Sequence, residues 1–103
     1  MKVAVIDYEV GNLANVYNAW KRLGVAVDIT RDPAVIRQAD FIELPGVGAI
    51  RDAMANLKKF ELIPVLEEQV RAGKFFMGVC LGMQALFEKD YEGGEYDCLG
   101  FLP

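Results

Sequence analysis

The sequence predicts a three-layer α/β protein, in which helices cover both faces of a mainly parallel sheet. Short apolar runs of strand length alternate along the chain with longer segments in which apolar residues recur at helical spacing. Turn-forming residues such as those of Asp32-Pro33 and Pro45-Gly46 separate the segments. This alternation predicts right-handed β–α–β units and therefore a parallel sheet.

The first predicted strand is Val3–Ile6, a continuous apolar run that ends at Asp7 and is typical of a strand buried on both faces. A helix is expected to start at Gly11-Asn12 and to end before Gly24, which is a good terminator. Its apolar stripe, which we expect to face the core, consists of Leu13, Val16, Tyr17, Trp20 and Leu23.

The second strand is expected at Val25–Ile29. A short helix follows, capped by Asp32, with Pro33 at its first position, and runs to about Ala39. The third strand is expected at Phe41–Leu44.

The turn Pro45–Gly48 closes the third strand. Two helical pieces, Ala49–Leu57 and Leu62–Ala72, are expected to follow, with a break near Phe60. Phe75–Val79 is the fourth predicted strand.

A helix is expected over Leu81–Lys89, and the remaining residues are expected to form a loop that enters a fifth strand at Leu99–Leu102. With 103 residues, the chain is expected to form a single domain, residues 1–103.

The composition is that of a globular protein, with 53 % hydrophobic and 25 % charged residues. The net charge of −4 argues against a nucleic-acid or anionic-membrane partner. No apolar run approaches the roughly 18 residues of a membrane span, and the N-terminus is too short and acidic for a signal peptide. We therefore expect a cytoplasmic protein.

The sequence contains no histidine and two cysteines, Cys80 and Cys98. A disulfide between them is not expected in the cytoplasm, and we interpret Cys98 as an incidental thiol. Without histidine or a C-x-x-C pair, no zinc or haem site is predicted, and no cofactor is expected.

Three features are predicted to meet at one rim of the sheet, because ligands of parallel sheets bind beyond the carboxyl ends of the strands. They are Tyr8–Asn12, Pro45–Gly48 and Cys80. This convergence is the strongest functional signal that the pattern provides.

The segment Gly78–Gly82 reads G-x-C-x-G, the cysteine form of a nucleophile elbow, in which a tight strand-to-helix turn requires glycine on both sides. Cys80 would lie at a helix N-terminus, which favours a thiolate, and the N–H of Leu81 would face an oxyanion. The pentapeptide alone fits a buried structural cysteine equally well.

Other rim residues are less specific. The N–H of Val47 could be a second oxyanion donor, although an ordinary turn is the simpler interpretation of the segment. Gln84 lies one helical turn after the cysteine and could face the same pocket, although an exposed helix glutamine explains it as well. Asp7 and Glu9 are most simply solvated loop acids.

Taken together, these residues resemble the glutaminase subunits of imidazole glycerol phosphate synthases, a family of class I, triad-type glutamine amidotransferases of histidine biosynthesis. The matching segments are DYEVGNLANVYNAWKRLG, LPGVGAIRDAMANL, GVCLGMQALFE and EGGEYDCLGFLP. The resemblance runs over essentially the whole chain but covers only about the N-terminal half of a family member. It implies a flavodoxin-like, three-layer fold with a sheet of four to five strands.

The resemblance also implies site roles. Cys80 matches the nucleophile, and Val47 and Leu81 match the two oxyanion-hole donors. The residues that match the glutamine-binding positions are Gly46, Gly48, Gln84 and Glu92. Asn12 lies in the loop that faces the (β/α)₈ synthase subunit, which receives the ammonia.

The chain departs from the family pattern in several places. The triad histidine and glutamate would lie beyond Pro103, so we expect negligible glutaminase activity from this chain alone, unless a complementary C-terminal half restores the triad. Glu9 stands where the family often has glycine. Glu43 places a carboxylate in an apolar strand, which would be a poor central strand unless Glu43 faced water or a partner.

Two alternatives remain open. The first is an engineered or diverged structural half-domain that self-associates as a homodimer, because a short sheet leaves an edge and an apolar face uncovered. The second, weaker alternative is a flavodoxin-like phosphate or nucleotide binder, which no G-x-G-x-x-G motif or P-loop supports.

Overall fold

The computed structural model describes residues 1–10, 12–79, 82, 85–86, 89–90 and 96–101. In chain order the elements are β1 (Lys2–Ile6), α1 (Leu13–Arg22), β2 (Ala26–Thr30), α2 (Pro33–Gln38), β3 (Phe41–Leu44), α3 (Ile50–Lys59), α4 (Ile63–Arg71), β4 (Phe75–Gly78), β5 (Lys89–Asp90) and β6 (Tyr96–Asp97). None of the helices in these ranges is long and apolar enough to cross a membrane.

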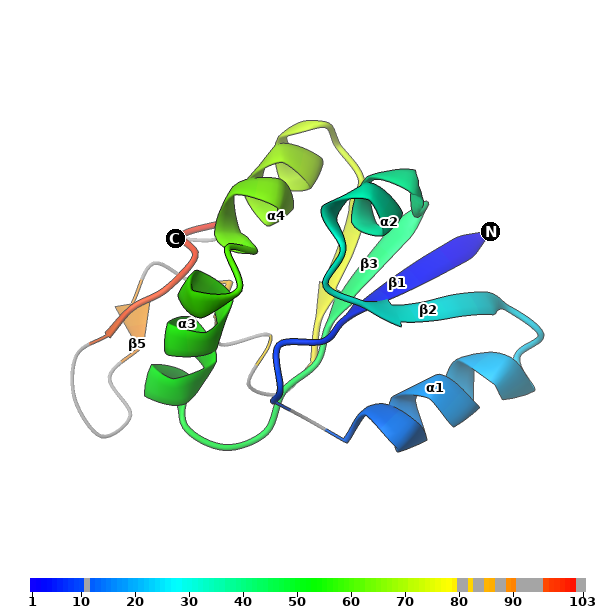
Figure 1. The fold of residues 1–103 in the computed structure, drawn as a ribbon, viewed down its shortest axis with the longest axis horizontal. Coiled ribbons are helices and arrows are strands. Elements are labelled where there is room, and N and C mark those ends of the chain that lie inside the picture. The colour runs from blue at the N-terminus through cyan, green and yellow to red at the C-terminus, as the bar shows by residue number, and fades with distance from the viewer. Residues whose placement is uncertain (11, 80–81, 83–84, 87–88, 91–95, 102–103) are drawn as a thin grey trace.

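The main sheet has four parallel strands in the order β2-β1-β3-β4. Val3 lies opposite Val27 on one side and Phe41 on the other, and Phe41 in turn lies opposite Phe75. Helix α1 covers one face, and α2, α3 and α4 lie on the other (Figure 1). The predicted three-layer α/β fold is confirmed, and the first four predicted strands are each found within one residue of their expected bounds.

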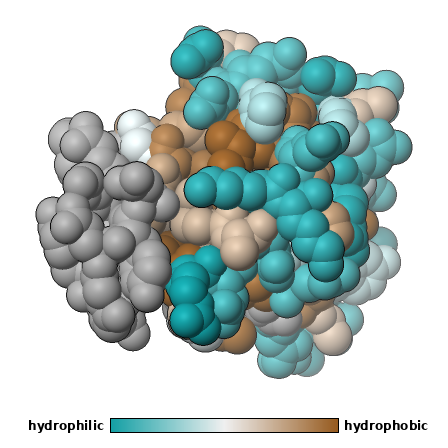
Figure 2. Space-filling view, turned by 60° about the vertical axis from the view of Figure 1, so that its left-hand side comes forward, coloured by the Kyte–Doolittle hydropathy of each residue, from teal (hydrophilic) through white to brown (hydrophobic). Residues whose placement is uncertain are grey.

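The hydrophobic core lies between the sheet and helices α2, α3 and α4. Strand residues with side chains on this face meet the apolar sides of the three helices. Fully buried members of this cluster include Ile6, Ile42, Leu44, Ile36, Leu57, Leu62 and Leu66. Each such side chain contributes about 1.5–3 kcal/mol by leaving water. The outward surface of this side is largely hydrophilic, with hydrophobic patches between the polar side chains (Figure 2).

Helix α1 differs from the prediction that its apolar stripe forms core. None of its residues is buried, Tyr17 is exposed, and Leu23, which caps the helix, is 72 % exposed. Trp20 is partly buried against the sheet, and its ring meets Phe41 edge-on at a centroid distance of 5.7 Å. The stripe stays open because, among the described helices, α1 alone covers this face of the sheet.

A groove of about 370 Å³ lies between α1 and the sheet as a result. Its lining is mainly apolar and consists of Asn15, Val16, Ala19, Trp20, Leu23, Glu43 and Met77. The groove therefore lies on the side of the sheet that only one helix covers.

Glu43 does not behave as expected. We predicted that it would have to face water or a partner, yet its residue is only 4 % exposed. Its Oε1 accepts a hydrogen bond from the indole Nε1–H of Trp20 at 2.6 Å. A buried polar group is tolerated when it is hydrogen-bonded, so Trp20 explains how β3 accommodates this carboxylate.

The C-terminal predictions are wrong in part. The predicted helix was to reach Lys89, but Lys89 belongs to β5, which pairs with β6 as a short antiparallel ladder. Leu99 to Phe101 do not form the predicted fifth strand, because the N–H of Leu99 donates to the carbonyl of Ala85 at 2.8 Å. This bond directs the chain back to the turn at Ala85. The rest of the predicted helix lies mostly outside the described residues.

The Trp20–Glu43 bond can be tested with Trp20→Phe, which keeps an aromatic ring against Phe41 but removes the only donor of the indole. The carboxylate then loses its hydrogen bond, and we expect the free energy of unfolding in urea to fall by about 1–3 kcal/mol. Combining Trp20→Phe with Glu43→Leu should recover most of the loss, since two apolar groups leave nothing unsatisfied.

Tyr17→Phe is the matched control, because it removes an exposed hydroxyl from the same helix. It should change stability by less than about 0.5 kcal/mol. Equal effects of Trp20→Phe and Tyr17→Phe would show that the Glu43 bond contributes nothing.

Candidate functional site

The segments after β1, β3 and β4 meet at the carboxyl-end rim of the sheet, where ligands of parallel sheets bind. Asp7 to Val10 follow β1, Pro45 to Ala49 follow β3, and Val79 follows β4. The predicted convergence is therefore found for the described rim residues. Cys80, Leu81, Gln84 and Glu92 lie outside the described residues.

The backbones that follow β3 and β4 are in direct contact. The N–H of Val79 donates to the carbonyl of Leu44 at 3.0 Å, and the N–H of Gly82 donates to the carbonyl of Val79 at 2.9 Å. A Cβ added to Gly82 would overlap the Leu44 carbonyl. The sequence analysis explained this glycine by a steric clash in a tight turn. The group that a side chain would clash with is the carbonyl at the end of strand β3.

The segment Pro45–Gly48 starts from this contact. Pro45 and Gly46 are buried, whereas Val47 is 61 % exposed. Gly48 has φ of 101°, a backbone conformation that side chains rarely allow. The segment thus emerges from the core and presents Val47 at the surface of the rim.

Tyr8 anchors this segment, and sequence reasoning missed its role. Its hydroxyl donates to the carbonyl of Pro45, and its own carbonyl accepts a hydrogen bond from Asn56 Nδ2 at 3.0 Å. Tyr8 is fully buried, and this burial raises the pKa of its phenol well above the usual value of 10.0. The sequence did contain a hint of this role. A tyrosine directly after a buried strand tends to be buried itself, and a buried tyrosine hydroxyl needs a hydrogen-bond partner.

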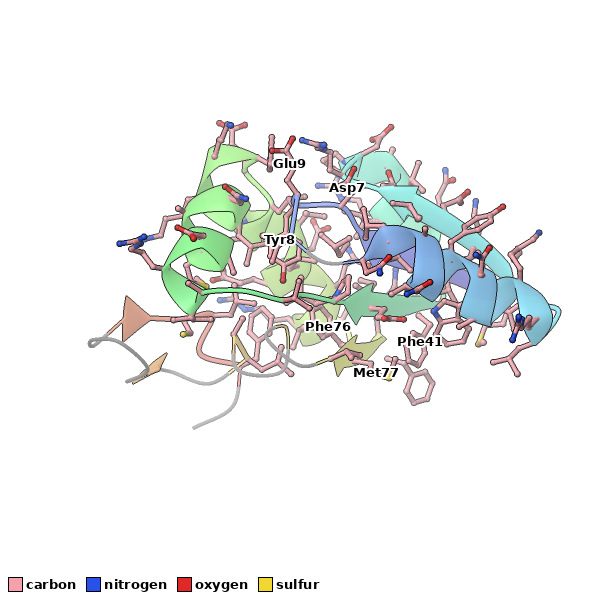
Figure 3. The ribbon with its side chains drawn as sticks, turned by 90° about the horizontal axis from the view of Figure 1, so that it is seen from below. Asp7, Tyr8, Glu9, Phe41, Phe76 and Met77 are labelled. Atoms are coloured by element: carbon pink, nitrogen blue, oxygen red, sulfur yellow. The ribbon has the colours of Figure 1, made fainter. Side chains whose placement is uncertain are left out.

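Asp7 and Glu9 share one arginine. Arg31 Nη2 lies 3.3 Å from Asp7 Oδ2 and 3.6 Å from Glu9 Oε2, and its guanidinium sits 4.0 Å from the ring centroid of Phe60. The three side chains are partly exposed, so these ion pairs add little stability. Asp7 and Glu9 are therefore loop acids that pair with Arg31. Figure 3 shows both residues in the segment after β1.

Asn12 has a local structural role. It is the N-cap of α1, and its Oδ1 accepts a hydrogen bond from the N–H of Asn15 at 3.4 Å. The side chain is exposed, so this cap leaves it accessible at the rim. No cluster of histidine, cysteine or acidic side chains within the described part of the chain could hold a metal ion.

The comparisons with known proteins identify the family of the chain. Residues 4–92 match the family model of class-I glutamine amidotransferases. The chain belongs to the class-I glutamine amidotransferase family. Glu9 has a φ of 63°, the left-handed conformation that favours glycine, which is the residue that the resemblance leads us to expect at this position.

Individual relatives carry the name imidazole glycerol phosphate synthase subunit HisH. The one from Lactococcus lactis subsp. lactis (strain IL1403) is 52 % identical over 101 residues, covering 98 % of this chain and 50 % of the relative. That from Aquifex aeolicus (strain VF5) is 47 % identical over 103 residues and is also covered to 50 %. The chain thus spans about half the length of the curated relatives it matches.

Solved structures show the same fold at low identity. A crystal structure of a glutamine amidotransferase superposes with a TM-score of 0.79 at 21 % identity, over 95 % of this chain and 51 % of that one. A Listeria monocytogenes EGD-e protein assigned to peptidase E gives a TM-score of 0.81 at 19 % identity, over 98 % and 62 % of the two chains. At these identities the likeness concerns the fold alone.

Gly82→Ala tests the contact between the two rim backbones. Because the new methyl group would overlap the Leu44 carbonyl, β3 and the turn must separate, and we expect a loss of at least about 3 kcal/mol in the free energy of unfolding. Chemical denaturation measures it.

Gly73→Ala is the matched control, since Gly73 has φ of 82° but open space around its Cβ position. It should cost only about 1 kcal/mol, from the left-handed backbone alone. If the two substitutions cost the same, the close approach at Gly82 is not a constraint.

The Tyr8 anchor predicts a pH dependence. A phenol whose pKa is raised in the folded state stays protonated there while the unfolded chain ionises, so stability is retained below pH 10 and lost above it. This single group should lower the free energy of unfolding by about 1.4 kcal/mol per pH unit above pH ~10.

Tyr8→Phe isolates this effect, because the other tyrosines and the lysines titrate equally in both proteins. The difference in stability between the two proteins should shrink as the pH rises above 10. A difference that is constant with pH would contradict a buried, protonated Tyr8.

Proposed function

We propose that this chain is the half of a glutaminase domain that carries the nucleophile and the oxyanion-hole segment. The contact between the ends of β3 and β4 carries the proposal, because it brings the Pro45–Gly48 segment beside the start of G-x-C-x-G through Val79, Leu44 and Gly82. Family membership and the names of the HisH relatives support the same assignment.

The reaction is the hydrolysis of glutamine. The thiolate of Cys80 attacks the side-chain amide carbon, and the resulting oxyanion accepts hydrogen bonds from the N–H groups of Val47 and Leu81. Collapse of this intermediate expels ammonia, which must gain a proton, and leaves a γ-glutamyl thioester. Attack by water on the thioester then releases glutamate and restores the thiol.

Substrate and partner contacts complete the proposal. Gly46 and Gly48 would let glutamine approach the backbone, and Gln84 and Glu92 would hold it. Asn12, exposed at the same rim, would contact a (β/α)₈ synthase subunit that uses the ammonia to make imidazole glycerol phosphate in histidine biosynthesis.

Tyr8 would support catalysis indirectly in this reaction. Its carbonyl accepts a hydrogen bond from Asn56 of α3, and its hydroxyl donates to the carbonyl of Pro45, so Tyr8 links α3 to the start of the oxyanion segment. A fixed backbone at Pro45 limits the orientations of the Val47 N–H, and preorganised donors are the effective ones.

The leaving ammonia needs a proton from a general acid. Histidine is the usual donor, and the 103 residues include none. General acid–base catalysis typically contributes ~10²–10⁴-fold, so we expect negligible turnover by this chain alone. The relatives are about twice as long, and the family resemblance assigns the triad histidine and glutamate to their additional half.

The test measures glutamate release from glutamine by the 103-residue chain, alone and mixed with the unmatched half of the Lactococcus lactis relative as a second polypeptide. We expect no activity from either piece and a rise of at least about 10²-fold in the mixture, because the triad is then complete.

Cys80→Ala in the same mixture should abolish the gain, whereas Cys98→Ala should preserve it. Cys80-dependent turnover by the isolated chain would refute its predicted inactivity. A mixture that forms a complex but releases no glutamate would refute the assigned nucleophile half.

A further inference from the structure

Arg31 contacts both chain neighbours of the tyrosine that anchors the Pro45 carbonyl. Its Nη2 lies 3.3 Å from Asp7 Oδ2 and 3.6 Å from Glu9 Oε2. Tyr8 lies between these two acids in the sequence, and its hydroxyl donates to the carbonyl of Pro45. One guanidinium therefore pairs with the residues on either side of the anchor.

The backbone of residues 7–9 explains how both acids reach the same arginine. The N–H of Asp7 donates to the carbonyl of Thr30 at 3.0 Å and so extends the pairing of β1 with β2. Glu9 has φ of 63°, and its N–H donates to Asp7 Oδ1 at 3.3 Å. In Figure 3, Glu9 lies at the margin of the molecule and Tyr8 lies in its interior. A side chain in this left-handed conformation strains the backbone, so the turn depends on contacts that hold it.

Arg31 is itself held against helix α3. Its guanidinium lies 4.0 Å from the ring centroid of Phe60, the C-cap of this helix. The N–H of Phe60 donates to the carbonyl of Asn56 at 3.0 Å, and Asn56 Nδ2 donates to the carbonyl of Tyr8 at 3.0 Å. The contacts thus close a ring that begins and ends at the turn around Tyr8. A planar guanidinium can stack on the phenylalanine while its N–H groups face the carboxylates, which a compact ammonium does less well.

We propose that Arg31 is a positioning residue for the oxyanion segment: by holding Asp7 and Glu9, it fixes the turn that directs the Tyr8 hydroxyl to the Pro45 carbonyl. The ion pairs are partly exposed and stabilise the fold little, so the effect of Arg31 is on geometry rather than on stability. The catalytic consequence rests on the proposed glutaminase function, whereas the position of Tyr8 does not.

The first test measures the position of Tyr8 in the isolated 103-residue chain by NMR. With tyrosine labelled at the ring carbon Cζ, the Tyr8 resonance reports the surroundings of the hydroxyl, and Tyr8→Phe assigns it. Arg31→Met keeps an unbranched apolar side chain beside Phe60 but removes the charge and every N–H. We expect the Tyr8 resonance to move toward that of the exposed Tyr17.

Arg37→Met is the matched control, because Arg37 forms an exposed ion pair at 2.8 Å with Glu68, which joins α2 to α4 and does not involve Tyr8. It should leave the Tyr8 resonance unchanged. Arg31→Lys keeps the charge and should move the resonance less than Arg31→Met does. Circular dichroism checks that the variants fold, and Arg31→Lys alone serves for the comparison if Arg31→Met does not.

The second test measures the catalytic consequence in the mixture with the unmatched half of the Lactococcus lactis relative. Loss of an interaction made only in the transition state lowers kcat and leaves KM unchanged. Removing an oxyanion donor outright costs ~10²–10³-fold in kcat, so a donor that is only loosened by Arg31→Met should cost about tenfold. Arg37→Met should change neither constant.

An unchanged Tyr8 resonance in the Arg31 variants would overturn the proposal. A KM that rises at constant kcat would also overturn it, because Arg31 would then act on substrate binding. A resonance that moves while kcat stays constant would refute the catalytic consequence. If the wild-type mixture releases no glutamate, the proposed glutaminase function fails, and the NMR comparison alone decides whether Arg31 positions Tyr8.

Discussion

The backbone carbonyl of Leu44, at the end of β3, is the constraint on which the rim of this sheet depends. It accepts the N–H of Val79 and leaves no space for a side chain at Gly82. The next carbonyl, that of Pro45, accepts the hydroxyl of Tyr8. Two successive carbonyls thus join three strand ends, and they set where the PGVG and G-x-C-x-G segments can lie relative to each other.

The two faces of the sheet are stabilised differently. Helices α2, α3 and α4 bury one face in a continuous apolar cluster, whereas α1 covers the other with side chains that are at most partly buried, among them Leu13, Val16 and Trp20. The bond from Trp20 to Glu43 allows a carboxylate on the less covered face without an unsatisfied oxygen, and the groove beside it remains open.

The meeting of strand ends at one rim could be predicted from local sequence, and the contacts that hold the rim together could not. PGVG and GVCLG are short motifs whose glycines follow from backbone sterics, so the sequence alone identified them. The anchors Tyr8 and Asn56 are 48 residues apart, and Arg31 is 24 residues from Asp7. No local pattern reports such contacts, because they form only when β1, β2 and α3 pack together. Cys80, Leu81, Gln84 and Glu92 keep their assigned roles as predictions.

The sequence by itself determined the alternation of strands and helices and the parallel sheet, because hydrophobic period is a local property. The resemblance of its motifs indicated the family. Only the tertiary structure decided that no residue of helix α1 is fully buried and that Glu43 is buried with a donor, since both depend on which elements cover a face. It also decided that residues 89–90 form a strand and that Leu99 turns back to Ala85. Over segments of two or three residues, intrinsic helix or strand propensity contributes little free energy. Long-range backbone hydrogen bonds, such as the one from Leu99 to Ala85, therefore decide the local structure.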